Sequence, residues 1–321
     1  MIVYILVVLV AGLAYSDLLS RYGQLWSNLP TTKQSKFCTE SVSILIPFRN
    51  ERTNLPQLLE CLERLNTENI DLEIIFINDH STDGGDHYVK QYTSTHSIRV
   101  LNIKENKGKK AALKYGWYHS KGAILVQTDA DCILPQNWLT TMIAPFANEE
   151  IVLSCGPVKF ATASNFWHRI VSLDFAALIA IGAAHIAWNK PMICNAANLA
   201  YRRSLVADAE LKETRASGDD VFLLQSAFRQ NPEGIQFVKN KTALVETAGP
   251  SSFRSFWNQR LRWASKNGEY DITSNKWILI GVWLYNVLIV GSLLSFNAVG
   301  ITGAAMLILL KVLAEDKFYG K

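Results

Sequence analysis

Val42-Ser-Ile-Leu-Ile46 and Leu72-Glu-Ile-Ile-Phe-Ile-Asn78 are two short apolar runs of the kind that forms buried β-strands. Between them, Asn54 and Gln57 are spaced as a capping box at the start of a helix, and leucines recur at helical spacing at positions 58, 59, 62 and 65. A strand, a helix and a second strand in this order form a crossover that joins parallel strands. This stretch therefore predicts an α/β fold with a Rossmann-like, doubly wound sheet.

The alternation of strands and helices continues along the chain. Ser97–Leu101 is a third predicted strand, Lys107–His119 a helix and Ala123–Thr128 a fourth strand. After about residue 150 the pattern becomes a mixture of strands and helices, which includes the nearly uncharged Phe175–Trp188. We expect one domain over residues 38–267, because about 230 residues are enough to bury one sizeable core.

The two ends of the 321-residue chain are much more apolar than its middle. No residue from Met1 to Ser16 is charged, and 34 uncharged residues separate Lys276 from Lys311. Because about 20 apolar residues cross a bilayer, we expect transmembrane helices at 1–20, 277–294 and 298–314, with a juxtamembrane linker at 21–37. A cleaved signal peptide is the alternative for the first helix. For the last, a re-entrant segment or further spans beyond residue 321 stay open.

Basic residues flank the apolar stretches on the side of the central domain, at positions 21, 33, 36, 266, 276, 311, 317 and 321. The positive-inside rule then predicts a multi-pass protein whose central domain is cytoplasmic. The size and architecture favour the plasma membrane of a bacterium, and a eukaryotic endomembrane stays open.

Cysteine and charge content exclude several classes of function. The five cysteines, at 38, 61, 132, 155 and 194, contain no C-x-x-C pair, so neither a zinc site nor a disulfide framework is expected. The net charge of +4 is too small to indicate a nucleic-acid partner.

Carboxylates cluster where the predicted strands end. Glu51 follows the first strand, Asp79 the second, and Asp129 and Asp131 the fourth. Ligands of open parallel sheets bind at the carboxyl ends of the strands, so these side chains are candidate site residues. Asp129 and Asp131 are two apart on extended chain and project to the same side, as a pair holding one Mg²⁺ or Mn²⁺ would. A helix-capping turn before Pro135 is the alternative.

Two further charged groups lie at predicted helix starts. Lysines at 104, 107, 109, 110 and 114 surround Gly108, and such a helix N-terminus suits a diphosphate, with a solvated basic face as the alternative. Asp219 and Asp220 begin another helix. One of them could cap that helix, and a carboxylate beside a metal-bound diphosphate can also act as a general base.

The stretch Phe253–Trp263 is a basic, aromatic, amphipathic helix of the kind that anchors proteins at the membrane surface, and it ends in Gln259-Arg-Leu-Arg262-Trp263. With the Asp-x-Asp pair, the strand-end carboxylates and the Asp219-Asp220 pair, this Q-x-x-R-W motif resembles the membrane-bound branch of the family-2 glycosyltransferases with a GT-A fold. The resemblance extends from about Ser41 to Trp263, with the motifs in the family's order.

The resemblance implies roles in binding a nucleotide sugar. Pro47, Arg49 and Glu51 would line the nucleotide base and ribose, Asp79 would contact the base, and Lys109 would approach the diphosphate. The sequence departs from the family at positions 78 and 80, where Asn and His replace residues of a D-D-G-S run.

The resemblance also implies the catalytic and acceptor residues. Asp129 would face the nucleotide and Asp131 the metal ion, and Asp220 would be the catalytic base, with Asp219 beside it. Asn198 would lie beside the acceptor. Three residues of the Q-x-x-R-W motif would close over the diphosphate and the acceptor, namely Gln259, Arg262 and Trp263.

The implied activity is inverting, metal-dependent transfer of a sugar to a membrane lipid or lipid-linked acceptor, in envelope glycolipid or polysaccharide synthesis. UDP is the commonest donor nucleotide in this branch, and GDP-sugars stay open. A processive polysaccharide synthase of the cellulose, chitin or hyaluronan type is the alternative, although three spans are few for a channel. A nucleotidyltransferase would leave the arginine and tryptophan beside the membrane unexplained. A non-catalytic scaffold or nucleotide-sugar sensor would be expected to lack a carboxylate at 129, 131 or 220, and all three are present.

Overall fold

The computed structural model describes residues 2–32, 40–104, 107–161, 165–207, 219–264 and 273–320. The chain divides into two compact units. The sheet unit comprises Pro30–Gly182 and Ile193–Gly268, and the helical unit comprises Met1–Leu29, Ala183–Met192 and Glu269–Lys321. Each unit is described separately below.

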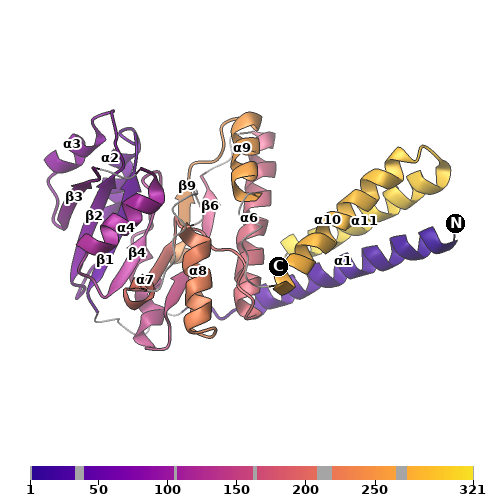
Figure 1. The fold of residues 1–321 in the computed structure, drawn as a ribbon, viewed down its shortest axis with the longest axis horizontal. Coiled ribbons are helices and arrows are strands. Elements are labelled where there is room, and N and C mark those ends of the chain that lie inside the picture. Colours follow the sequence, from indigo (N-terminus) through magenta and orange to yellow (C-terminus); the bar gives the residue numbers. More distant parts are fainter. Residues whose placement is uncertain are drawn as a thin grey trace. The chain divides into compact units, whose positions relative to one another are not determined.

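The sheet unit is built on a seven-stranded sheet with the strand order β3-β2-β1-β4-β7-β5-β8 (Figure 1). Its first four strands are parallel, and β7 runs antiparallel to both of its neighbours, β4 and β5. A second sheet pairs β6 with β9. The strands are β1 (Val42–Phe48), β2 (Leu72–Asn78), β3 (Ser97–Asn102), β4 (Ile124–Gln127), β5 (Leu153–Cys155), β6 (Val158–Phe160), β7 (Leu199–Arg202), β8 (Ile235–Phe237) and β9 (Val245–Thr247). The predicted α/β class with a mostly parallel sheet is confirmed.

Helices cover the sheet and supply much of its core. β1 is buried at every position, and α2 packs its leucines into the same apolar cluster. The expected capping box is wrong, because the Asn54 side chain makes no cap hydrogen bond and donates to Glu51 instead. The shorter helices of this unit are α2 (Leu55–Glu63), α3 (Gly85–Gln91), α4 (Lys109–His119), α5 (Trp138–Ile143), η1 (Ala144–Ala147), α7 (Ser204–Ala207), α8 (Asp219–Gln230) and η2 (Lys241–Ala243).

Two further helices, α6 (Phe166–Ala187) and α9 (Phe253–Ala264), lie side by side (Figure 1). The Trp167 ring packs against the rings of Phe253 and Phe256, and Arg260 of α9 forms an ion pair with Asp174 of α6. The last five residues of α6 belong to the helical unit. Sequence patterning did not identify α6 as a helix, because its apolar residues show almost no one-sided periodicity.

The helical unit contains α1 (Ile2–Asn28), α10 (Thr273–Leu294) and α11 (Ala298–Tyr319). Helix α11 contacts both of the others, and Val8, Tyr285, Ile289 and Leu307 form the buried centre of the three. Four helices of the described residues are long and apolar enough to cross a membrane, namely α1, α6, α11 and residues 276–294 of α10.

The pairing of strands in the sheet determines whether α6 can cross a membrane. Helix α6 lies between β4 and β7 in the sequence, and these two strands pair in one sheet. A single crossing by α6 would put the paired strands on opposite sides of a bilayer. Helix α6 therefore does not act as a single membrane crossing.

Candidate active site

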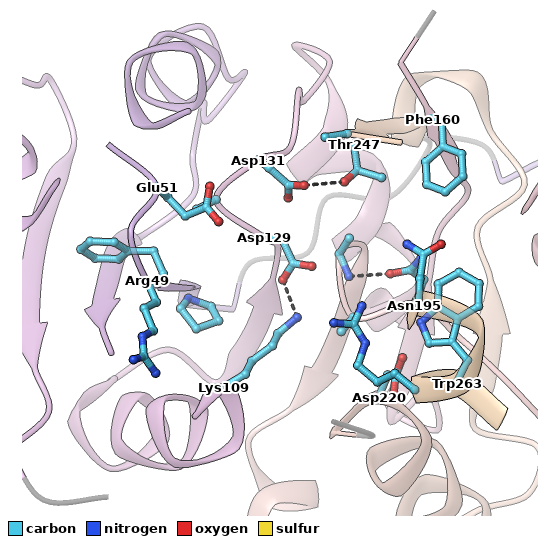
Figure 2. Close-up of a pocket in the computed structure, with 18 of the residues that line it drawn as sticks. Arg49, Glu51, Lys109, Asp129, Asp131, Phe160, Asn195, Asp220, Thr247 and Trp263 are labelled. Atoms are coloured by element: carbon cyan, nitrogen blue, oxygen red, sulfur yellow. Dashed lines mark hydrogen bonds and ion pairs between the residues drawn. The ribbon is translucent and has the colours of Figure 1, made fainter. Parts of the chain in front are cut away.

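A cavity of about 530 Å³ lies at the carboxyl ends of β1, β2 and β4 (Figure 2). We call it the strand-end cavity. Most of the residues singled out from the sequence line it, although they come from segments more than 200 residues apart. They are Pro47, Arg49, Glu51, Asp79, Lys109, Asp129, Asp131, Asp220, Gln259, Arg262 and Trp263.

The Asp-x-Asp pair follows β4, and its two carboxylates have different partners. Lys109 Nζ lies 2.5 Å from Asp129 Oδ1, and Thr247 Oγ1 donates to Asp131 Oδ2 at 3.0 Å (Figure 2). Lys109 is the first residue of α4, and Thr247 ends β9. Asp129 is thus turned toward the lysine and Asp131 toward the second sheet. Thr247 was missed by the sequence analysis, because only the pairing of β6 with β9 brings it to the site.

Glu51 adds a third carboxylate to this side of the cavity (Figure 2). Burial raises its pKa, and the negative charges of Asp131 and Asp129 raise it further. The hydrogen bond from Asn54 Nδ2 to Glu51 Oε2, 2.5 Å long, acts in the opposite direction. The raised pKa of Glu51 is the electrostatic signature of negative charge concentrated in a partly buried space.

These carboxylates fit a divalent cation, because carboxylate oxygens are the ligands that Mg²⁺ and Mn²⁺ prefer and the positive charge would relieve the repulsion. Within the described residues, no group of three His, Cys, Asp or Glu side chains is arranged to close around an ion. Asp129 and Asp131 would therefore supply only part of the coordination, and water and substrate phosphate oxygens would supply the rest.

Asp79 joins the end of β2 to the start of α4. Its carboxylate is nearly buried, and Oδ2 accepts a hydrogen bond from the Gly108 N–H at 2.9 Å. Gly108 has φ of +105°, a conformation that side chains rarely adopt, and it directly precedes Lys109. Asp79 thereby fixes the backbone that presents Lys109 to Asp129.

The loops after β1 and β2 are tied to each other. Asn50, at φ +57°, donates its backbone N–H to Ser81 Oγ at 3.0 Å and accepts from the Thr82 N–H at 2.8 Å through its side chain. His80 also has φ of +57°. Two non-glycine residues in the left-handed region beside one cavity indicate a backbone held in place by its surroundings, as is common at ligand sites.

Helix α9 contributes the opposite wall. The Trp263 ring lies 6.0 Å from the ring of Phe175 on α6, and Phe175 stacks on Phe160 at 4.1 Å. Within the described residues, the buried Gln259 Oε1 has no hydrogen-bond partner. A buried acceptor without a partner is costly in free energy, and Gln259 is one of the residues that line the cavity. Phe160 and Phe175 were not singled out from the sequence, because apolar residues carry no chemical signal.

Asp220 lies in the first turn of α8, and its Oδ1 accepts from the Val221 N–H at 2.9 Å. Its backbone carbonyl accepts a weak hydrogen bond from Cys194 Sγ at 3.4 Å, which links α8 to the segment that contains Asn195. Asn195 also lines the cavity. The side chain of Asp219 lies outside the described residues.

Asn198 does not line the cavity. Its side chain is fully buried, where Nδ2 donates to the carbonyls of Pro157 at 2.9 Å and Ala243 at 2.7 Å. Oδ1 accepts from Trp138 Nε1 at 2.9 Å. With its polar atoms engaged in this way, Asn198 joins three segments of the fold, and its neighbours Asn195, Ala196 and Ala197 line the cavity instead.

The four free cysteines described, Cys61, Cys132, Cys155 and Cys194, take no part in a disulfide, and Cys38 lies outside the described residues. Burial raises the pKa of the Cys132 thiol, next to Asp131, far above its ordinary value. It is therefore a protonated, apolar neighbour of the site and not a nucleophile.

Comparison with known proteins supports this chemistry. The sequence profile described as Glycosyl transferase family 2 matches residues 43–208. "Probable glycosyltransferase YdaM" of Bacillus subtilis is 26% identical over 251 residues, which are 75% of this chain and 58% of that protein. The poly-β-1,6-N-acetyl-D-glucosamine synthase of Staphylococcus aureus is 22% identical over 232 residues, 72% of this chain and 55% of that protein. The chain thus spans less than two thirds of the length of these relatives.

Among solved structures, the mannosyltransferase PcManGT of Pyrobaculum calidifontis, in complex with GDP-Man and Mn²⁺, superposes with a TM-score of 0.62. The alignment covers 98% of this chain and 97% of that one at 16% identity, so it is a likeness of fold. The profile match covers half of the sequence, including β1, β2, β4 and the Asp-x-Asp pair. The chain belongs to glycosyltransferase family 2 and has a GT-A fold.

Proposed function

We propose that the chain is an inverting, metal-dependent glycosyltransferase that moves a sugar from a nucleotide sugar to a membrane lipid or lipid-linked acceptor. The observation that carries this proposal is the strand-end cavity itself. It brings together the Asp-x-Asp pair, the base candidate Asp220, and Arg262 and Trp263 of α9. A nucleotide-sugar transferase needs a cation site, a proton acceptor and a cationic closure over the diphosphate in one place.

The proposed reaction is an in-line displacement at the anomeric carbon of the donor. The acceptor hydroxyl oxygen forms the new bond to this carbon as the bond to the diphosphate oxygen breaks, and Asp220 takes the hydroxyl proton. Lys109 and Arg262 stabilise the charge of the departing nucleoside diphosphate. A divalent cation held by Asp131 and Asp129 would supply further positive charge at the diphosphate. Attack opposite the leaving group inverts the configuration.

Pro47, Arg49 and Glu51 follow β1 and are proposed to bind the base and ribose of the donor. Asp79 is proposed to contact the base, although its bond to Gly108 also gives it a role in holding α4. UDP is the nucleotide that the resemblance favours, and the mannosyltransferase of similar fold holds GDP-Man. The donor assay therefore includes both nucleotides.

The membrane acceptor is proposed from the surface of α6 and α9. The two helices expose an apolar surface on the outside of the sheet unit, while Gln259 and Trp263 of α9 face the cavity. We name this surface the α6–α9 face, formed by Phe166, Ile170, Leu173, Phe253, Trp257 and Leu261. Exposed apolar residues flanked by arginines are typical of helices that lie in the interface of a bilayer. Such a helix would hold the active site beside a lipid acceptor.

We further propose that α1, α10 and α11 span the plasma membrane of a bacterium and that the sheet unit is cytoplasmic, where nucleotide sugars are made. The domain boundaries proposed are 1–20, 38–267, 277–294 and 298–314, with a linker at 21–37. A processive polysaccharide synthase is the second candidate, because a poly-β-1,6-N-acetyl-D-glucosamine synthase matches 72% of the chain. Analysis of product length separates the two.

The test uses the full chain in detergent with total membrane lipids and a panel of UDP- and GDP-sugars. We expect release of nucleoside diphosphate that needs Mn²⁺ or Mg²⁺, is stimulated by lipid and yields a product with inverted anomeric configuration. In Asp220→Asn, kcat should fall by about 10²–10⁴-fold, the range for loss of a general base, with little change in donor binding.

Glu60→Gln is the matched control, because Glu60 is an exposed carboxylate on α2 that pairs only with Arg64 in the described structure. It should keep the activity of the unmodified chain. If no donor turns over with any lipid extract, and calorimetry detects no metal-dependent nucleotide binding, the catalytic proposal fails and a scaffold takes its place.

A further inference from the structure

The helical unit contains a second cavity, of about 750 Å³. It lies along α1 and α10, with Trp188 at one end, and all of its lining residues belong to the helical unit. On α1 the lining residues Val7, Ala11, Ala14 and Leu18 recur at three- and four-residue spacing, so they form one face of the helix. We call this cavity the α1–α10 groove.

The groove has the dimensions and chemistry of a site for a hydrocarbon chain. From Val7 to Arg21 it follows α1 for about 21 Å at 1.5 Å per residue, which is most of the depth of a hydrocarbon core of about 30 Å. Its hollow shape comes from small residues, Ala11 and Ala14 on one side and Gly281 on the other. A side chain added at Gly281 would meet nothing within 4 Å, so the space beside it is open.

One end of the groove is polar. Arg21 Nε donates to Asp17 Oδ2 at 2.8 Å, which orients the guanidinium group. Within the described part of the chain, the remaining N–H groups of Arg21 have no partner, and its side chain is 58% exposed. Lys190 Nζ lies 4.6 Å from the centre of the Trp188 ring, so a second cation stands near this end.

A guanidinium group with its terminal N–H groups available matches the geometry of a phosphate. The apolar walls exclude a soluble anion from the rest of the groove. A molecule that satisfies both ends has a phosphate head and a long hydrocarbon chain.

We propose that the α1–α10 groove binds the lipid acceptor, with its hydrocarbon chain between α1 and α10 and its phosphate group on Arg21. This inference rests on the proposed function, and it specifies the acceptor as a phosphate-headed lipid. If the positive-inside orientation holds, Arg21 lies at the cytoplasmic surface, on the same side of the membrane as the sheet unit.

A lipid is favoured over a protein helix as the occupant. A helix with side chains is about 10 Å across, and a cavity of 750 Å³ distributed over about 21 Å of α1 has a mean cross-section of only about 36 Å². That cross-section matches a hydrocarbon chain and is well below that of a helix.

The test measures lipid binding directly in nanodiscs that contain the full chain. Phosphatidic acid with a diazirine in one acyl chain is photo-activated, and the labelled peptides are mapped by mass spectrometry. Diacylglycerol with the same chains is the second probe, because it lacks the phosphate. We expect phosphatidic acid to label peptides of α1 and α10 at groove positions, at least fivefold more than diacylglycerol does.

Gly281→Leu should fill the groove and lower this labelling at least fivefold, and Gly281→Ala should have an intermediate effect. Gly291→Leu is the matched control, because Gly291 is on the same helix, has nothing within 4 Å of an added side chain and does not line the groove. Its labelling should stay within twofold of the unmodified chain. Arg21→Gln should abolish the preference for phosphatidic acid over diacylglycerol while keeping the chain labelling.

Three results would overturn the inference. The first is labelling spread evenly over the lipid-facing positions of α1, α10 and α11. The second is equal loss in Gly281→Leu and Gly291→Leu, and the third is equal labelling by the two probes. Labelling needs no turnover, so its outcome is separate from the transferase assay. An active transferase whose KM for lipid acceptor is the same in Gly281→Leu would refute the groove as the acceptor site and leave the proposed function intact.

Discussion

Two glutamates of the sheet unit have pKa values displaced in opposite directions. Burial and neighbouring carboxylates raise the pKa of Glu51, so the folded state holds its proton more tightly than the unfolded state does. The stability gained from this proton is fully present below the pKa of Glu51 in the unfolded chain. It is lost as the pH rises through the raised pKa of Glu51 in the folded protein. Glu51→Gln should therefore raise the Tm at pH 7 in metal-free buffer by about 1–3 °C, a modest effect because solvent screens this group.

Glu73 is the control of opposite sign. Burial opposes its ionisation, but hydrogen bonds from Ser43 and the Lys121 backbone, together with the charge of Arg99, keep its pKa below the ordinary value. Its contribution is present at neutral pH and is lost as the pH falls through the lowered pKa. Glu73→Gln should cost about 1–2 kcal/mol at pH 7, with the difference closing in acid. Thermal unfolding from pH 4 to 8 checks both variants, and a shift of the same sign in both at pH 7 would contradict the argument.

The two asparagines of the 195–198 segment should behave differently. Asn198→Ala leaves the Ala243 carbonyl and the Trp138 N–H without their hydrogen-bond partner and removes one of the two donors to the Pro157 carbonyl, so it should lower the free energy of unfolding by about 2–4 kcal/mol. Asn195→Ala removes a cavity-lining side chain and should change the KM of a substrate with a smaller loss of stability. Denaturant unfolding and steady-state kinetics on both variants would decide, and a fully stable Asn198→Ala with altered KM would restore Asn198 as a substrate contact.

At the scale of elements, α9 combines two functions on two faces. Trp263 faces the cavity and packs on Phe175, whereas Trp257 is 54% exposed on the α6–α9 face. We expect Trp263→Ala to reduce kcat by at least tenfold with membrane binding unchanged. Trp257→Ala should weaken the binding of the α6–α9 face to anionic vesicles, assayed in the absence of detergent, with nucleotide binding unchanged. The weaker binding would be seen as a loss of fluorescence quenching by brominated lipid. The same defect in both variants would mean that α9 acts as one packing element.

The elements that could be predicted from the sequence are those whose own pattern carries the information. β1 and β2 are mostly apolar runs, and the predicted β2 has the observed bounds. Strands β5, β6, β8 and β9 have three residues each, too few for a periodic signal, and only their pairing defines them. Asn54 shows that a capping pattern in the sequence does not ensure a capping hydrogen bond. The pattern is present, but the Asn54 side chain donates to the neighbouring carboxylate of Glu51 instead.

The candidate site was largely predictable for a related reason. Parallel strands place their carboxyl ends at one edge, so Glu51, Asp79 and the Asp-x-Asp pair could be grouped without coordinates. Thr247, Phe160 and Phe175 could not, because they reach the cavity through β6, β9 and α6, whose positions depend on tertiary packing. Asn198 was assigned to the acceptor, and the chain offered no way to tell a buried asparagine from a cavity-lining one three residues earlier.

At the scale of the whole molecule, the number of membrane crossings follows from the sheet. Four helices are apolar enough to cross, and α6 is excluded as a single crossing because it connects paired strands of one sheet. Val171 and Phe175 of α6 are instead buried in the core of the sheet unit. If α1, α10 and α11 all cross, the number of crossings is odd, and the two ends of the chain lie on opposite sides of the membrane.

Reporter fusions test this topology. We expect a fluorescent protein that folds only in the cytoplasm to be bright at the C-terminus, and a phosphatase that is active only outside to be active at the N-terminus. A C-terminal phosphatase fusion should be inactive, as the reciprocal control. The fusions could instead report that both ends of the chain lie on the same side of the membrane. Even then α6 would not be a membrane crossing, because β4 and β7 must lie on one side of the membrane. That result would require that α1, or one helix of the α10–α11 hairpin, does not span the membrane. Helix α1 would be examined first, because the α1–α10 groove can receive a phosphate-headed acceptor only if the Arg21 end of α1 reaches the cytoplasmic surface.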